Sequence, residues 1–118
     1  MPSKIERCAI YIRVSTAEQM MHGKSLEAQK QYLTNYAKEH NMTVAGVYAD
    51  EGKTARKELK KRKAIHSLLE DVKAGKIDVI IFWRIDRWFR NLSDFYKVQE
   101  VLDDNNVRWI STSEPGIN

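Results

Sequence analysis

The 118-residue chain is poor in the residues on which several common kinds of protein depend. Cys8 is the single cysteine, so no internal disulfide can form, and we expect a core thiol in a reducing compartment. The sequence has no secretory h-region and no apolar run long enough to cross a bilayer. These absences argue against a disulfide-stabilised secreted domain and predict a cytoplasmic protein without membrane contact.

Metal ligands and nucleotide-binding motifs are also scarce. His22, His40 and His66 are not spaced as metal ligands, and we interpret them as solvated side chains. Neither G-x-x-x-x-G-K-[ST] nor G-x-G-x-x-G occurs in the sequence. We therefore expect no metal and no nucleotide or other cofactor.

The composition that remains is that of one soluble globular domain, with 42% hydrophobic and 31% charged residues. No internal repeat, linker or low-complexity segment divides the chain, so residues 1–118 form a single predicted domain. Twenty basic and sixteen acidic residues leave a net charge of +4. That excess is a mild indication of a polyanionic partner.

Strand and helix patterns alternate along the chain. Apolar extended stretches predict strands at 7–13, 43–48, 78–82 and 107–111. Helical spacing of apolar residues predicts helices from Leu26 to about His40, across Ile65–Val72 with a stop at Gly75, and across 92–102. The stretch 50–54 is predicted to be a loop. This alternation indicates an α/β fold: an open, mainly parallel sheet of four or slightly more strands with helices on both faces. It does not predict the strand order.

The first strand ends in a serine and an arginine that can share a site. Arg13 and Ser15 are two residues apart, so in a strand both point to the same face. No histidine lies near Ser15 in sequence, whereas an arginine suits a phosphate substrate. Ligands of open α/β sheets bind beyond the carboxyl ends of the strands, where four more charged residues follow strand three: Arg84, Asp86, Arg87 and Arg90.

Three blocks together resemble the catalytic domain of the serine recombinases, the resolvase/invertase family. They are Tyr11-Ile12-Arg13-Val14-Ser15-Thr16 with Gln19, Ser25-Leu26-Glu27-Ala28-Gln29, and Ile85-Asp86-Arg87 with Arg90. The blocks occur in family order, and the resemblance covers essentially the whole chain. The loop between Gln19 and Leu26 is longer than in small resolvases and is similar to that of large serine integrases and transposon recombinases. The resemblance implies the resolvase-like three-layer fold.

The resemblance also implies a reaction. Ser15 would attack a DNA phosphate, form a 5′-phosphoseryl link and release a 3′-hydroxyl, without metal or ATP. Arg13, Arg87 and Arg90 would bind the scissile phosphate, and Asp86 would orient arginines. Tyr11 and Gln19 match positions that support the site in the family. Thr54 is assigned the same supporting role, at a position where the family often has serine.

A further arginine is expected just before the second helix. Arg62 is the first candidate and Arg56 the alternative, because the chain departs from the family there, with Thr54-Ala55 for Ser-Gly and Lys63 for proline. The surrounding basic residues could contact the DNA backbone or form a solvated face; these are Arg56, Lys57, Lys60 and Lys61. Arg84 stands where the family usually has lysine and is grouped with them.

The implied partner is double-stranded DNA, with a homodimer or tetramer in a full-length protein of bacterial or phage origin. Residues 1–118 would be the N-terminal catalytic domain of that protein, without its oligomerisation helix and DNA-binding region. Such a fragment is not expected to recombine DNA alone. Two alternatives remain open at this point: a non-catalytic DNA-binding or regulatory module of the same fold, and a phosphate-ester hydrolase.

Overall fold

The computed structural model describes residues 5–14, 26–51, 63–83 and 92–112. Four strands alternate with three helices: β1 (Glu6–Val14), α2 (Leu26–Glu39), β2 (Met42–Glu51), α3 (Lys63–Lys73), β3 (Val79–Phe82), α5 (Leu92–Asp104) and β4 (Arg108–Ser111). All neighbouring strands pair in parallel, in the order β2-β1-β3-β4. The predicted α/β class is confirmed.

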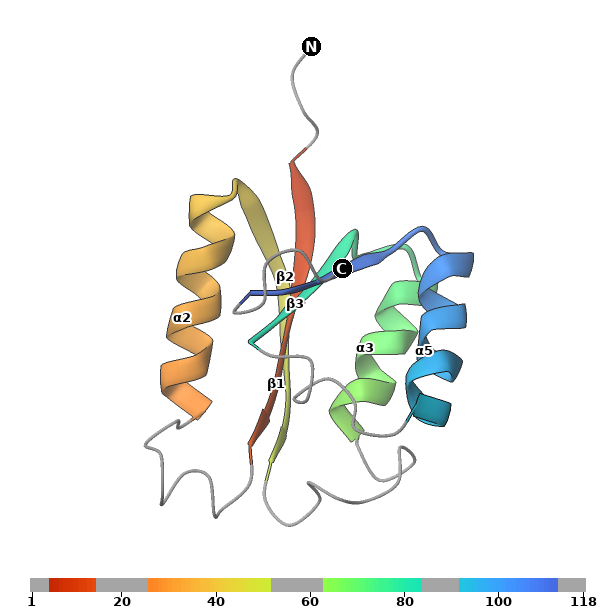
Figure 1. The fold of residues 1–118 in the computed structure, drawn as a ribbon. Coiled ribbons are helices and arrows are strands. Elements are labelled where there is room, and N and C mark those ends of the chain that lie inside the picture. The colour runs from red at the N-terminus through yellow and green to blue at the C-terminus, as the bar shows by residue number, and fades with distance from the viewer. Residues whose placement is uncertain (1–4, 15–25, 52–62, 84–91, 113–118) are drawn as a thin grey trace.

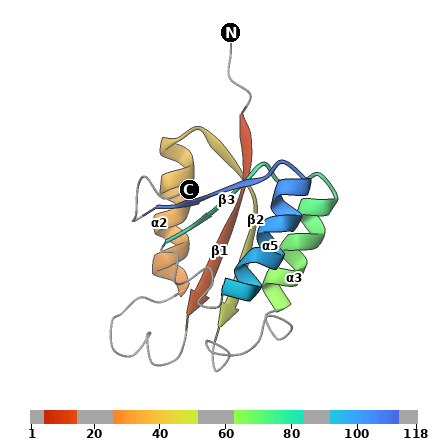
Figure 2. The same cartoon turned by 45° about the vertical axis from the view of Figure 1, so that its right-hand side comes forward.

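The helices form two outer layers around the sheet. Helix α2 covers one face, and α3 and α5 lie together on the other (Figures 1 and 2). The strand order explains this arrangement, because crossovers between parallel strands are right-handed. The chain moves outward from β1 to β2 and then back across the sheet to β3 and β4. The first crossover helix and the two later ones therefore lie on opposite faces.

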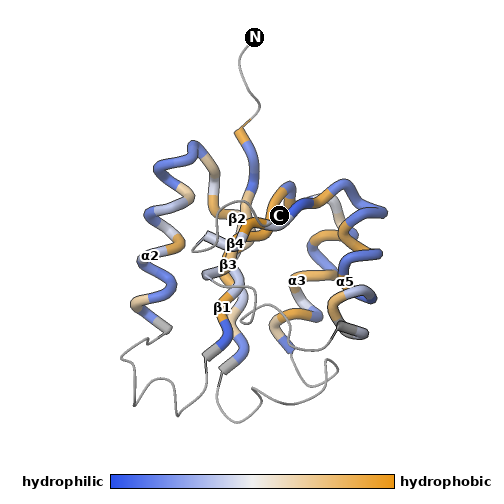
Figure 3. The backbone as a smooth tube through the Cα atoms, viewed as in Figure 1, coloured by the Kyte–Doolittle hydropathy of each residue, from blue (hydrophilic) through white to orange (hydrophobic). Residues whose placement is uncertain are grey.

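Each face of the sheet has its own apolar core, and β1 contributes to both. Ala9 and Tyr11 pack under α3 and α5, whereas Ile10 and Ile12 pack under α2. Strand β3, Val-Ile-Ile-Phe, is fully buried and supplies both cores, which explains its unbroken apolar sequence. Figure 3 shows the same pattern, with hydrophobic residues concentrated in the central strands and on the sides of the helices that face the sheet.

One predicted boundary is wrong. Asp50 and Glu51 are not in a loop but form the end of β2, where they pair with Arg13 and Val14 of β1. The extension depends on a partner strand and not on local propensity, since acidic residues are poor strand formers. The predicted stop at Gly75 is confirmed, because that glycine follows the end of α3 with a φ of 75°.

No helix of the described ranges is both long and apolar enough to span a membrane.

Candidate active site

The carboxyl ends of all four strands meet at one edge of the sheet, and β1 and β3 are neighbours there. The connection after β1 runs to the α2 face, and the connection after β3 runs to the opposite face. This makes the β1–β3 pair the topological switch point of the sheet, where α/β proteins bind their ligands. The segments with Ser15 and with Arg84 to Arg90 begin at these two strand ends.

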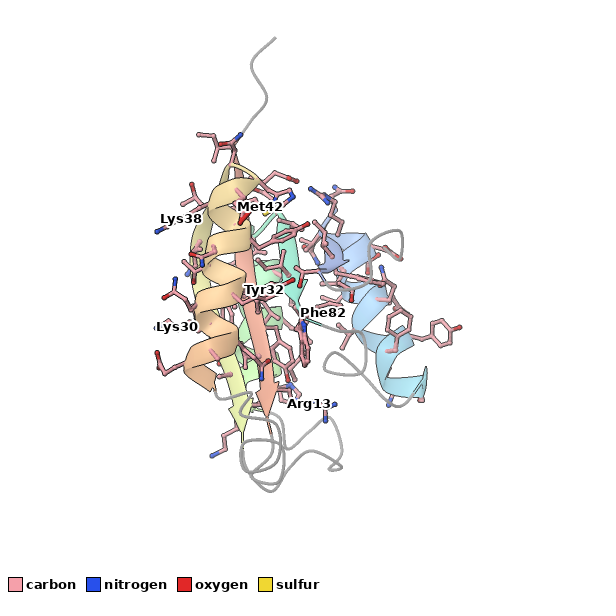
Figure 4. The ribbon with its side chains drawn as sticks, turned by 60° about the vertical axis from the view of Figure 1, so that its left-hand side comes forward. Arg13, Lys30, Tyr32, Lys38, Met42 and Phe82 are labelled. Atoms are coloured by element: carbon pink, nitrogen blue, oxygen red, sulfur yellow. The ribbon has the colours of Figure 1, made fainter. Side chains whose placement is uncertain are left out.

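Of the predicted site residues, two lie in the described parts of the chain. Tyr11 and Arg13 occupy alternate positions of β1, and Figure 4 shows Arg13 at the tip of this strand. Tyr11 is completely buried and Arg13 is 4% exposed. The other predicted residues lie outside the described ranges: Ser15, Gln19, Thr54, Arg56, Lys57, Lys60, Lys61, Arg62, Arg84, Asp86, Arg87 and Arg90.

The buried arginine gives this edge a permanent positive charge. A guanidinium does not lose its proton in proteins, and its planar fork matches two oxygens of a phosphate. Because solvent screens a buried charge weakly, Arg13 acts on a nearby anion more strongly than an exposed arginine would. Arg13 is therefore the residue of the described edge that is chemically suited to an anionic ligand.

A carboxylate that the sequence prediction left out of the site, Asp50, lies beside these residues. Asp50 is 7% exposed and pairs with Arg13 in the β1–β2 register. Its Oδ2 accepts a 2.8 Å hydrogen bond from the Tyr11 hydroxyl. Its Oδ1 accepts one of 2.9 Å from the backbone N–H of Ala64, and Oδ2 another of 3.3 Å from that of Ile65. Asp50 thus joins β1, β2 and the first turn of α3.

The sequence contains a signal that the second predicted helix needs a capping acceptor from another part of the chain. Residues 60–63 are all lysine or arginine, and neither side chain has a hydrogen-bond acceptor. Helix α3 begins at the last residue of this run, so its first N–H groups need an acceptor from elsewhere in the chain. Across the described ranges, no cluster of three or more histidine, cysteine, aspartate or glutamate side chains could hold a metal ion.

The fold is a parallel α/β domain with a buried arginine at its switch point, the place where such folds bind ligands. The sequence profile described as "Resolvase, N terminal domain" matches residues 8–118. The chain belongs to this family.

Two solved structures and one curated protein illustrate the likeness. The N-terminal catalytic domain of TP901-1 integrase is 33% identical, with a TM-score of 0.78 over 90% of this chain and 77% of that one. The C-terminal catalytic domain of ISC1926 TnpA, an IS607-like serine recombinase, is 28% identical, with a TM-score of 0.76 over 95% and 71% of the two chains. A putative DNA recombinase of Bacillus subtilis (strain 168) is 34% identical over 84% of this chain. The matched region spans 19% of that protein's length.

Proposed function

We propose that the chain is the catalytic domain of a site-specific DNA recombinase that cuts and rejoins DNA through Ser15. The observation that carries the proposal is the pairing of β1 with β3, because the serine and the Asp86–Arg90 stretch then follow neighbouring strand ends. The family membership and the names of its relatives support the same reading. Double-stranded DNA is the proposed substrate, and the proposed compartment is the cytoplasm.

In the proposed reaction the Ser15 hydroxyl oxygen attacks the phosphorus of the DNA backbone. The new bond joins the serine to the 5′ side of the break, and the bond to the 3′ oxygen breaks. The serine proton is lost, and the leaving 3′ oxygen takes up a proton. Reversal of these steps on an exchanged strand rejoins the DNA, so the bond energy is conserved in the protein–DNA link and no ATP is needed.

The arginines supply the positive charge that the reaction requires. Negative charge develops on the non-bridging phosphate oxygens, and fixed cations stabilise it most in a site with little solvent. Arg13 is the buried cation of the described edge, and Arg87 and Arg90 are the proposed additional ones. We assign Asp86 to orienting these arginines, Arg62 or Arg56 to the same phosphate, and Gln19 and Thr54 to support. The basic residues 57, 60, 61 and 84 are proposed to contact the DNA backbone.

We also propose that residues 1–118 belong to a longer protein, because the curated relative is several times longer than the region it shares with this chain. Residues 1–118 would be its N-terminal catalytic domain, and other segments would supply assembly into a dimer or tetramer and DNA-site recognition. The experiments below therefore use the full-length protein.

The test is a covalent trapping assay. The full-length protein is incubated with a duplex that carries its recombination site and is nicked beside the crossover, so that the released 3′ fragment diffuses away. Wild type should leave protein-linked DNA that survives denaturation, and Ser15→Ala should leave none. Ser67→Ala, at an exposed position of α3, is the matched control and should behave as wild type.

Two results would contradict the proposal. Linked DNA in the Ser15→Ala variant would exclude Ser15 as the nucleophile. Turnover of a small ester such as p-nitrophenyl phosphate, with no DNA adduct, would instead favour a phosphate-ester hydrolase.

The arginines can be tested in the same assay. Arg87→Ala should lower the cleavage rate by roughly 10²–10³-fold, the usual effect of losing one transition-state donor, while DNA affinity changes much less. Arg108→Ala is the control, because Arg108 lies at the amino end of β4 and pairs with Glu6 at 2.5 Å. Equal losses of rate and affinity in Arg87→Ala would make Arg87 a DNA-binding residue only.

A further inference from the structure

The outer edge of β2 has no neighbouring strand in the described part of the chain. β2 is the first strand in the order β2-β1-β3-β4 and pairs with β1 on its inner side. Thr43, Val44, Ala45 and Val47 are exposed along it. Residues 42–49 contain neither a charged residue nor a proline, the features that usually keep two edge strands apart. This edge is therefore open to a further strand.

A bulge turns two valines of this edge to the same face of the sheet. Cys8 pairs with Val44 and Ile10 with Val47, so two steps along β1 correspond to three along β2, and Ala45 is the extra residue. Cys8 and Ile10 both pack in the core under α2, which places both valines on the α2 face. Without the bulge, residues three apart would point to opposite faces. Val44 is 36% exposed and Val47 is 38% exposed, so together they form an apolar strip beside α2.

This strip is complementary to a second copy of itself. In an antiparallel pairing about a twofold axis between Ala45 and Gly46, Val44 lies opposite the partner's Val47, and Val47 opposite the partner's Val44. Cross-strand pairs of β-branched side chains stabilise antiparallel sheets. The small residues Ala45 and Gly46 at the centre let the two backbones approach. One twofold contact thus covers all four valines.

Helix α2 fits the same arrangement. It packs over both β1 and β2, so its axis lies about half a strand spacing inside β2. Adjacent strands are about 4.8 Å apart, and the twofold axis lies half that spacing outside β2. The two α2 helices would then be about 10 Å apart, within the usual range for packed helices. Sheet pairing therefore brings the helices together without moving either.

The charges on α2 match an antiparallel neighbour. Glu27 is in the first turn and Lys38 in the last, and their separation of eleven residues, about three turns, puts them on one side of the helix. Figure 4 shows Lys30 and Lys38 pointing to one side of α2, away from β3, and Tyr32 to the other. An antiparallel copy places each Glu27 beside the partner's Lys38. Lys30 is the charge that lies near its own copy, and its flexible stem lets the amine turn to solvent.

We infer that the β2 edge is an interface between two copies of this chain. The two β2 strands pair antiparallel, the two sheets become one sheet of eight strands, and the α2 helices pack side by side. The carboxyl ends of the strands then point in opposite directions in the two copies. On the proposed function, this contact joins copies that act on separate DNA segments, but the contact itself does not depend on that chemistry.

The experiment is disulfide cross-linking between two variants of the full-length protein, Val44→Cys and Val47→Cys. Opposite residues of antiparallel strands have Cα atoms about 4.5–5.5 Å apart, which a disulfide can bridge. Two copies of position 44, or two of position 47, are about 10 Å apart in this register, which is too far. The oxidised mixture should therefore give a dimer linked from 44 to 47, and each variant alone should give roughly tenfold less. Mass spectrometry of the linked peptides identifies the positions.

Tyr32→Cys is the matched control. Tyr32 is 43% exposed and lies on the other side of α2, so its mixture with Val47→Cys should give no linked dimer. Cys8 is buried and should not take part. Absence of the 44–47 link at the highest soluble concentration would overturn the inference. Links from 44 to 44 as abundant as those from 44 to 47 would also overturn it, because they require another register.

A charge exchange tests the helix contact without altering the strand. Glu27→Lys and Lys38→Glu should each weaken the 44–47 link by roughly two- to tenfold, and the two changes in one chain should restore it. Glu39→Lys, at the next position around the helix, should have no effect. Circular dichroism checks that each variant is folded. No weakening in either single variant, or no recovery in the double variant, would overturn the α2 part of the interface.

The interface and the proposed function can fail separately. The 44–47 link should form equally well in a Ser15→Ala background, since it needs no reaction with DNA. A link that persists where wild type gives no DNA adduct would leave the interface standing and overturn the function. A normal adduct without the link would do the reverse.

Discussion

Gly46 of β2 lies against the side chain of Tyr48, and replacing this glycine tests how tightly the two positions pack. A Cβ atom at this position would lie 2.9 Å from the Tyr48 Oη and 3.0 Å from its Cε1, so the tyrosine side chain would have to shift. Gly46 does not have a positive φ, so its backbone accepts alanine without strain. Gly46→Ala therefore changes side-chain contacts and leaves the backbone conformation allowed.

The expected magnitude follows from opposing effects. Alanine in a strand is favoured over glycine by about 0.5–1 kcal/mol. Overpacking against the tyrosine ring costs about 1–3 kcal/mol, and part of this is the weakened hydrogen bond from Tyr48 to Asp71. We expect Gly46→Ala to lower the free energy of unfolding by about 1–2 kcal/mol in total.

Urea unfolding followed by circular dichroism measures this change. With a slope of about 1–3 kcal/mol per molar urea, a loss of about 1–2 kcal/mol should lower the midpoint by roughly 0.3–2 M. In a Tyr48→Leu background the ring atoms that clash are gone, so Gly46→Ala should become neutral or slightly stabilising. In Tyr48→Phe the ring remains but the hydroxyl and its hydrogen bond are gone, so only the part of the cost that comes from the ring carbons should persist.

Gly75→Ala is the control for a glycine whose role is in the backbone. Gly75 has a φ of 75°, and an added Cβ would meet nothing within 4 Å, so its cost should be the same with or without Tyr48. The reasoning is refuted if Gly46→Ala costs as much in Tyr48→Leu as in the wild type, because the tyrosine would then not be the obstacle.

Two further predictions concern groups that lose a proton at alkaline pH. Burial raises the pKa of the Cys8 thiol to about 11, and its side chain has no exposed area, so the folded protein should resist iodoacetamide at pH 8 while urea-unfolded protein reacts readily. Rapid stoichiometric labelling of the folded chain would contradict this. Burial, and then the hydrogen bond to Asp71, raises the pKa of Tyr48 above its ordinary value near 10. Above that pH the unfolded chain loses the proton first, so stability should fall with rising pH, and Tyr48→Phe should flatten this decline. An unchanged slope in Tyr48→Phe would assign the decline to other groups.

The local patterns predicted the elements of the fold well. The apolar positions of α3 were identified from their spacing, and Ile65, Leu68 and Val72 are buried as expected. The unbroken apolar run of β3 predicted a strand covered on both faces, which the structure confirms. These predictions succeeded because burial on one face of a helix places apolar residues at helical spacing, and burial on both faces of a strand produces an unbroken apolar run. Both patterns are visible within a short stretch of sequence.

Asp50 shows where local reasoning was insufficient. Its neighbours Glu51 and Gly52 suggest a loop, and nothing adjacent indicates that Tyr11 and the first turn of α3 donate to it. The extension of β2 to Glu51 depends on pairing with β1, which is a property of the assembled sheet.

The sequence alone determined which segments are strands and helices and that they alternate, because periodicity is a local property, and residue type predicted which side chains carry phosphate chemistry. Only the tertiary structure decided that β1 and β3 are neighbours and that a carboxylate on β2 caps α3. Strand order depends on how the crossovers pack against the whole sheet, and such a cap depends on two segments meeting in space. No single stretch of sequence contains either relation.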